Sequence, residues 1–247
     1  MRNPRISARQ GVLVALLWTG GSAAGAAELV VNGGFEQNGG AGTNVFTGWT
    51  VVDQAGGSGS FYAQTGTSSP PPDVISVPKP PQASFSAMTS QSGPGSHAIY
   101  QDITIPSGAL TRFSAALYVN NQSGSFATPG TLDYSVSPNQ QARVDIMTTA
   151  SAITDVGSGV LLNVYQTKVG DPLVSGFTPI FADLAPFAGQ TVRLRIAEAD
   201  DQGNFNFGID QVSIDVAAAV PTLSEYALIA IAVLVLLASV ATLRSRR

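Results

Sequence analysis

The stretch Thr191-Val-Arg-Leu-Arg-Ile-Ala197 alternates apolar and charged side chains along the chain. Val192, Leu194 and Ile196 fall on one face of an extended backbone, and the two arginines between them fall on the other. This period of two is typical of a half-buried strand in an antiparallel sheet. The stretch therefore predicts an all-β fold in which one sheet face packs on an apolar core.

Similar segments recur through residues 28–219, separated by turns rich in glycine, proline, serine and asparagine. About ten short strands in a segment of this length predict a single domain built as a two-sheet β-sandwich. Besides the opening stretch, the predicted strands are Glu28–Asn32, Gly48–Asp53, Ser60–Gln64, Ala83–Thr89, Ala98–Ile105, Arg112–Asn120, Thr131–Val136, Gln141–Met147, Gly159–Thr167 and Gln211–Val216.

Residues 54–82 interrupt this rhythm with the proline clusters Ser69-Pro-Pro-Pro72 and Pro78-Lys-Pro-Pro81. Proline cannot donate a ladder hydrogen bond, so no central strand crosses these clusters. We expect a long surface loop inserted in one domain and tied down by Phe61 and Tyr62. A linker between two domains is the alternative, but the residues before it are too few for a core of their own.

The first 27 residues have the order of a secretory signal peptide. Residues 1–10 carry three arginines and no acid, residues 11–18 are apolar, and residues 20–27 are almost all small. An uncleaved membrane anchor is the alternative, but the apolar segment is too short to span a bilayer. We expect cleavage after Ala26 or Ala27, which leaves residues 28–219 as the exported domain.

The C-terminal segment, residues 220–247, combines a short polar motif, an apolar run and a basic end. From Ala227 to Leu243 there is no charged residue, and three of the last four residues are arginines. At about 1.5 Å per residue, a helix over 227–243 covers roughly 26 Å, just short of the ~30 Å hydrocarbon core. We expect a single transmembrane segment with the arginines on the cytoplasmic side and the domain outside.

Charge and cysteine content exclude several classes of partner and site. Residues 28–219 hold six basic and fifteen acidic residues, hence a net charge of −9. Phosphate neutralisation needs clustered Lys and Arg, so a nucleic acid partner is not expected. The chain has no cysteine, which excludes disulfides, thiol catalysis and Cys-ligated metals. The domain must therefore be stabilised by its core or by a bound ion.

The domain resembles the galactose-binding-like β-sandwiches, which include many carbohydrate-binding modules. Leu29-Val-Val-Asn-Gly-Gly-Phe-Glu36 and Phe46-Thr-Gly-Trp-Thr50 resemble the family's opening, and Tyr100-Gln-Asp-Ile-Thr-Ile105 an inner strand. Asn204-Phe-Asn-Phe-Gly-Ile-Asp-Gln-Val-Ser-Ile214 resembles its final strand. The resemblance implies a jelly roll of about eight strands plus additions, with both ends of the domain close together. Phe35 and Trp49 are expected to point inward.

The same resemblance implies a structural calcium ion where the first strand meets the last. Carried over by motif, its ligands are Glu36 and Asp210, and carboxylates suit this hard cation. The alternative is that Glu36 is a solvated turn residue and that Asp210 bonds backbone amides. The acidic run Glu198–Asp201 with Asn204 lacks the ligand spacing of an EF-hand; we expect it to cap a solvated hairpin.

The C-terminal segment resembles the bacterial sorting signals of the PEP-CTERM type, in the variant named for Ile-Pro-Thr-Leu. The motif here is Val220, Pro221, Thr222, Leu223, Ser224 and Glu225, so Val replaces Ile. Tyr226 stands where that family usually has Trp. The resemblance implies an exosortase-type membrane protease that cuts near the motif and passes the domain to the cell surface or extracellular matrix after transient anchoring in the inner membrane. A permanent single-span anchor is the alternative.

Catalytic residues are hard to find in the sequence. His97 is the only histidine, and Ser96 beside it does not stand in a strand-to-helix nucleophile elbow. We expect a loop histidine without a role. A glycosidase needs two carboxylates across a cleft, and among fifteen acids some pair always meets that demand. The sequence therefore predicts a protein that is not an enzyme.

Sugar binding needs aromatic faces with polar groups beside them. Trp49 suits the core better than a binding platform, whereas Tyr118 alternates outward beside Asn120. We take Tyr118, Asn120 and Tyr134 as the candidate ligand-binding residues, although ordinary surface tyrosines are the alternative. The leading hypothesis is a noncatalytic exported domain that binds exopolysaccharide. A structural or adhesive protein acting by protein contacts comes second, and a glycan-active hydrolase third.

Overall fold

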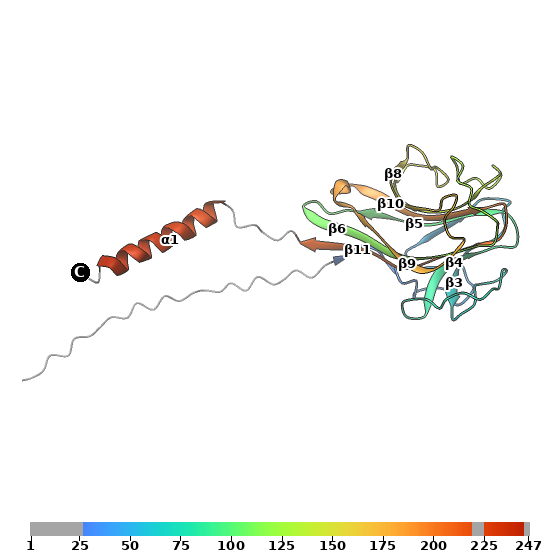
Figure 1. The fold of residues 1–247 in the computed structure, drawn as a ribbon, viewed down its shortest axis with the longest axis horizontal. Helices are drawn as coiled ribbons and strands as arrows, with labels where there is room; N and C mark the ends of the chain where they lie inside the picture. Colours follow the sequence, from blue (N-terminus) through green and yellow to red (C-terminus); the bar gives the residue numbers. More distant parts are fainter. Residues whose placement is uncertain (1–26, 219–224, 245–247) are drawn as a thin grey trace, which may run out of the picture.

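The structure, a computed structural model, describes residues 27–218 and 225–244. Two antiparallel sheets stack on each other (Figure 1). The first sheet has the order β3-β4-β11-β6-β9, with β1 also paired to β11, and the second has the order β2-β5-β10-β7-β8. This confirms the all-β jelly-roll sandwich.

The strands of the first sheet are β1 (Ala27–Glu28), β3 (Ser60–Thr65), β4 (Phe85–Ser90), β6 (Ala109–Asn121), β9 (Val174–Asp183) and β11 (Phe205–Ala218). Those of the second are β2 (Thr50–Asp53), β5 (Gly95–Thr104), β7 (Gln140–Thr148), β8 (Val160–Gln166) and β10 (Thr191–Asp200). A 3-10 helix η1 (Ala185–Phe187) and an α-helix α1 (Glu225–Arg244) complete the described elements.

The core lies between the sheets, where the predicted alternation places it. On β10, Val192, Leu194 and Ile196 are buried in the main apolar cluster. On β6, Phe113 and Leu117 belong to the same cluster. Each such side chain contributes about 1.5–3 kcal/mol through its removal from water.

The two ends of the domain meet, as the resemblance implied. β1 pairs with the end of β11, so that Ala27 lies opposite Val216. In the turn that follows β1, the Phe35 ring stacks on Trp49 with ring centroids 5.2 Å apart, and both side chains are buried. The indole nitrogen of Trp49 donates a hydrogen bond to the carbonyl of Asn32 at 3.1 Å. The inward placement of both aromatic rings is thus confirmed.

The strand predictions differ from the structure at three places. Of the predicted strand Glu28–Asn32, only Glu28 lies in a strand, because residues 31–34 form a turn. Residues 131–136 form turns, because side chains take up the backbone groups that a ladder would use. The Asn139 amide donates to the carbonyls of Thr131 and Asp133, at 3.1 and 2.9 Å. Conversely, β9 was missed because Gly176 and Pro179 interrupt its pattern. Among the described strands, β9 pairs with β6 alone. It is therefore an edge strand, where a proline is tolerated.

The proline-rich segment covers the outer face of the first sheet. β3 lies inside it and pairs with β4. Beyond β3, Ile75 and Val77 pack against Met88 and Tyr118 in a small second apolar cluster that also includes Phe177. This part of the sheet is therefore closed on both faces.

The ends of the chain lie largely outside the described residues, including the predicted signal peptide and motif residues Val220 to Ser224. Glu225 begins α1, a helix of 20 residues. By length and hydropathy, the described part of the chain contains no helix able to cross a membrane. The predicted span over 227–243 is therefore not confirmed.

Candidate functional site

Three ionisable residues lie side by side on neighbouring strands of the second sheet. Asp53 on β2 is the register partner of His97 on β5, and His97 is the partner of Glu198 on β10. Successive side chains of a strand alternate between faces. Glu198 therefore shares the face of Ile196, which belongs to the core. The row points into the sandwich.

His97 has one ring nitrogen engaged and one free. Its Nδ1 lies 2.8 Å from Oδ1 of Asp53, a partly exposed carboxylate. Its Nε2 is buried and has no hydrogen-bond partner in the part of the chain that the structure describes. The space beside Nε2 is left by Gly95, because a Cβ at that position would come within 2.5 Å of this nitrogen.

Asp200, two residues after Glu198, faces the same interior space. Glu198 is 0% exposed and Asp200 2% exposed. Within residues 27–218 and 225–244, both carboxylate oxygens of Glu198 and Oδ1 of Asp200 lack hydrogen-bond partners. One ligand atom each from His97, Glu198 and Asp200 lie within 4.8 Å of one another. The cluster thus contains four buried polar atoms that have no hydrogen-bond partner among the described residues.

Burial dominates the acidity of the two carboxyl groups. Desolvation, followed by the charge of Asp200, raises the pKa of Glu198 well above its ordinary value. Desolvation raises the pKa of Asp200 to about 7, although hydrogen bonds from Gln91 and the backbone of Gly95 oppose the shift. Leaving such groups ionised in an apolar interior without a partner is costly. The arrangement can hold a cation, or it can hold the acids in their neutral form.

A pocket of about 230 Å³ adjoins this row at the second sheet. Val52, Ala98, Leu132 and Ile153 give it an apolar lining, and Gln54, Ser96 and Thr154 add polar groups; His97 and Glu198 also contribute to its wall. The Ser96 hydroxyl donates to the carbonyl of Leu132, which fixes the 131–136 turns over the sheet.

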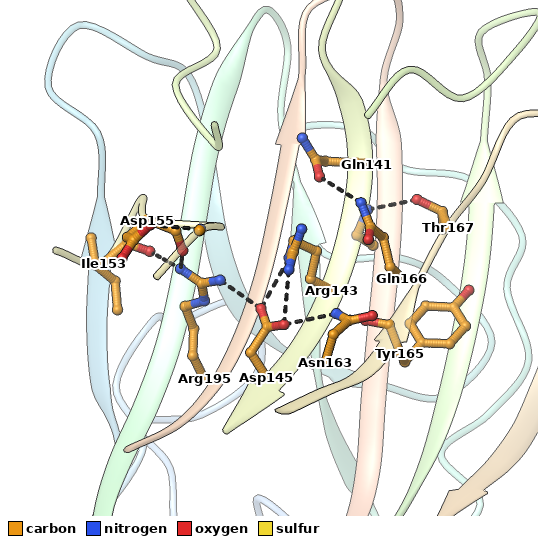
Figure 2. A network of polar contacts seen from close by, with 12 residues as sticks. Gln141, Arg143, Asp145, Ile153, Asp155, Asn163, Tyr165, Gln166, Thr167 and Arg195 are labelled. Atoms are coloured by element: carbon orange, nitrogen blue, oxygen red, sulfur yellow. Dashed lines mark hydrogen bonds and ion pairs between the residues drawn. The ribbon is translucent and has the colours of Figure 1, made fainter. Parts of the chain in front are cut away.

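A second polar network includes Arg195 (Figure 2). Arg195 alternates with Glu198 along β10, so this network lies on the face of the second sheet that points away from His97 and Glu198. Asp145 on β7 accepts two hydrogen bonds from Arg143, each 3.0 Å long, and one from Asn163 at 2.7 Å. Arg195 on β10 also donates to Asp145 and reaches the backbone carbonyls of Ile153 and Asp155.

This network holds the 149–159 loop against the sheet. Arg195 is 0% exposed because that loop covers it, and burial lowers the pKa of its guanidinium, with the nearby Asp145 acting in the opposite direction. Arg193, two residues earlier on the same face of β10, pairs with the exposed Asp102. The outward face of the opening stretch is therefore partly exposed at Arg193 and fully covered at Arg195.

The two predicted calcium ligands are brought near each other but are engaged with backbone amides. Glu36 Oε1 accepts from the amides of Ser84 and Phe85, at 3.0 and 2.8 Å. Asp210 accepts from the amides of Gln82 and Gln211, at 3.0 and 2.7 Å. Burial, and in smaller part the charge of Glu36, raises the pKa of Asp210 to about 7. Calcium at this pair stays a prediction.

Of the three predicted ligand-binding residues, Tyr118 and Asn120 contact each other, but Tyr134 lies at the other sheet. Tyr118 is 2% exposed, so the expectation that it points to solvent was wrong; the proline-rich segment covers it. Asn120 donates to the Tyr118 hydroxyl at 3.2 Å. Tyr134 belongs to the turns over the second sheet, where its amide donates to Ser96 Oγ at 3.0 Å.

Sequence reasoning also missed the converging cluster. His97 is a buried strand residue rather than a loop histidine, and Glu198 and Asp200 are buried rather than at a solvated hairpin. The usable signal was the alternation itself. Counted onward from Ile196, it places Glu198 and Asp200 on the core face.

Comparison with known sequence families finds a match for the C-terminal segment. Residues 218–247 match the IPTL-CTERM motif. The tail is a sorting motif of this type. No curated protein matches the chain in sequence.

Solved structures of similar architecture have diverse descriptions. A carbohydrate-binding module, TmCBM61 in complex with β-1,4-galactotriose, is 10% identical, with 76% of this chain and 97% of that chain covered and a TM-score of 0.43. A Stig cyclase, Fisc from Fischerella sp. TAU, is 12% identical over 79% and 100%, with a TM-score of 0.45. The K3 adhesin domain of Lys-gingipain from Porphyromonas gingivalis W83 is 12% identical over 79% and 100%, with a TM-score of 0.43. Likeness at this level carries no functional argument.

Proposed function

We propose that this chain is an exported bacterial protein that an exosortase-type membrane protease processes at its C-terminal motif. The processed domain then resides at the cell surface or in the extracellular matrix and binds polysaccharide there without cutting it. The observation that carries this proposal is the IPTL-CTERM motif at residues 218–247, which begins where β11 ends at Ala218.

The surroundings of His97 support a noncatalytic role. A serine hydrolase needs its nucleophile hydrogen-bonded to the histidine. Ser96 instead donates to a backbone carbonyl, and Nε2 of His97 is buried without a hydrogen-bond partner among the described residues. A glycan-active hydrolase remains the least supported alternative.

The polysaccharide proposal is best tested at the pocket of the second sheet. Tyr134 is not in the pocket wall, but its amide donates to Oε1 of Gln54 at 3.4 Å. Gln54 lines the pocket and donates to Asp133 at 2.6 Å. An aromatic ring next to amide groups is the combination that sugar faces and hydroxyls engage. The alternative function, a structural or adhesive protein that acts through protein contacts alone, does not require such a pocket.

Two measurements test the proposal. The intact mass of the exported protein should end near Pro221 and lack Arg247; retention of Arg247 would favour a permanent anchor. A glycan array that includes the exopolysaccharide of the producing strain should show binding that Tyr134→Ala reduces, while Tyr134→Phe keeps it. If the protein binds no polysaccharide, the result favours a structural or adhesive function instead.

A further inference from the structure

We propose that His97, Glu198 and Asp200 bind a divalent transition-metal ion of the Zn²⁺ class inside one end of the sandwich. The site goes beyond the proposed polysaccharide function and does not depend on it. It is also distinct from the predicted calcium pair, Glu36 and Asp210, which the first sheet and its loops supply.

The spacing of the free atoms fits an ion. Zn²⁺ lies about 2.0–2.2 Å from imidazole nitrogen and carboxylate oxygen, so that two ligand atoms of one ion stand roughly 3–4 Å apart. One ligand atom from each of the three residues lies within 4.8 Å of the others. Among the described residues, His97 Nε2, both oxygens of Glu198 and Oδ1 of Asp200 have no hydrogen-bond partner. Buried polar atoms are rarely left in this state.

The geometry around His97 is that of a metal ligand with an outer-shell partner. Metal-binding histidines usually give their second ring nitrogen to a carboxylate, which fixes the tautomer and the ring orientation. Asp53 Oδ1 lies 2.8 Å from Nδ1 of His97, which leaves Nε2 as the ring nitrogen available to an ion. Gly95 keeps the approach to Nε2 clear.

The charges also call for a cation. Neither Glu198 nor Asp200 takes part in any ion pair among the described residues, and both are almost completely buried. A divalent ion would neutralise two adjacent carboxylates and would satisfy the free oxygens at the same time. Without an ion, the interior must hold these groups uncharged or at a high cost.

The ligand set selects the class of ion. Calcium takes six to eight oxygen ligands, whereas three side chains including one imidazole are typical of Zn²⁺ and other first-row metals. We therefore expect Zn²⁺, Co²⁺ or Mn²⁺ to bind and Ca²⁺ not to bind at this cluster.

The test uses the full-length protein in detergent, stripped with a chelator and titrated separately with Zn²⁺, Co²⁺ and Ca²⁺. Calorimetry should give one Zn²⁺ per chain, and bound Co²⁺ should show visible d–d absorption. Glu198→Gln and Asp200→Asn should each lose more than the roughly 10–100-fold in affinity typical of outer-shell changes. Asp53→Asn should fall within that range. Asp102→Asn, an exposed acid on β5, is the control and should bind like wild type.

Loss of binding through misfolding is distinguished by the metal-free proteins. Glu198→Gln removes a buried ionisable group, so we expect a cooperative melt at or above the midpoint of the metal-free wild type, without the increase that Zn²⁺ gives to wild type. The proposal is overturned if wild type binds no Zn²⁺ or Co²⁺, or if Glu198→Gln binds them as tightly as wild type. Stabilisation by Ca²⁺ that Glu36→Gln abolishes would report the other pair and would not support this site.

Discussion

Replacing Asp145 by asparagine should destabilise the domain severely, because two buried guanidinium groups depend on this one carboxylate. Asp145 is 0% exposed, Arg195 0% and Arg143 4%, and both arginines donate to Asp145 (Figure 2). Removing one partner of a buried ion pair costs about 3–5 kcal/mol, since an uncompensated charge stays inside the protein. For a domain of this size the expected decrease in melting temperature is on the order of 10 °C.

The matched control is Asp102→Asn, which breaks an Arg–Asp pair of similar geometry at the surface. Arg193 donates to both Asp102 oxygens, at 2.7 and 3.0 Å, but the Asp102 side chain is 39% exposed. Exposed pairs contribute about 0–1 kcal/mol. Urea unfolding of both variants measures the difference. Limited proteolysis should also cut the 149–159 loop faster in Asp145→Asn. The role of Asp145 as the partner of two buried arginines would be refuted if both variants lost equal free energy of unfolding. A loss under about 1 kcal/mol for Asp145→Asn would refute it as well.

Three further changes probe the core, a close backbone contact and the predicted calcium pair. Phe35→Ala removes a fully buried ring and should cost about 3–5 kcal/mol in a denaturant titration. Gly33→Ala would drive its Cβ into a backbone carbonyl of β11 and should lower the melting temperature strongly, whereas Gly124, with open space around it, should accept alanine with little effect. If Glu36 and Asp210 bind calcium, saturation to 100 times the dissociation constant should add about 2.7 kcal/mol of stability. An unchanged melting temperature with Ca²⁺ would count against calcium there.

The sequence predicted the sheets well because the period of two records which side chains share a face. β6, β7 and β10 extend the predicted strands by only a few residues, and their apolar faces form the core. The period does not record what covers the other face. Tyr118 and Arg195 both alternate outward from the core, yet loops distant in the sequence bury them.

The candidate site could not be predicted for a related reason. An acid in a strand is ordinarily assigned to solvent, since ionised groups are rarely buried. Glu198 and Asp200 instead follow the inward phase that Val192 sets. Only the register of β10 with β5 brings His97 to them, and register between distant strands is not readable from either strand alone.

An ion bound by His97, Glu198 and Asp200 would stabilise a domain that has no disulfide. The chain has no disulfide with which to restrain its unfolded state. His97 and Asp200 are far apart in the sequence, and a metal clip that closes a long loop reduces chain entropy more than one that closes a short loop. Because ligands converge only in the folded sandwich, the free energy of metal binding adds to the free energy of folding. The same two carboxylates that destabilise a metal-free core would then cross-link β5 to β10.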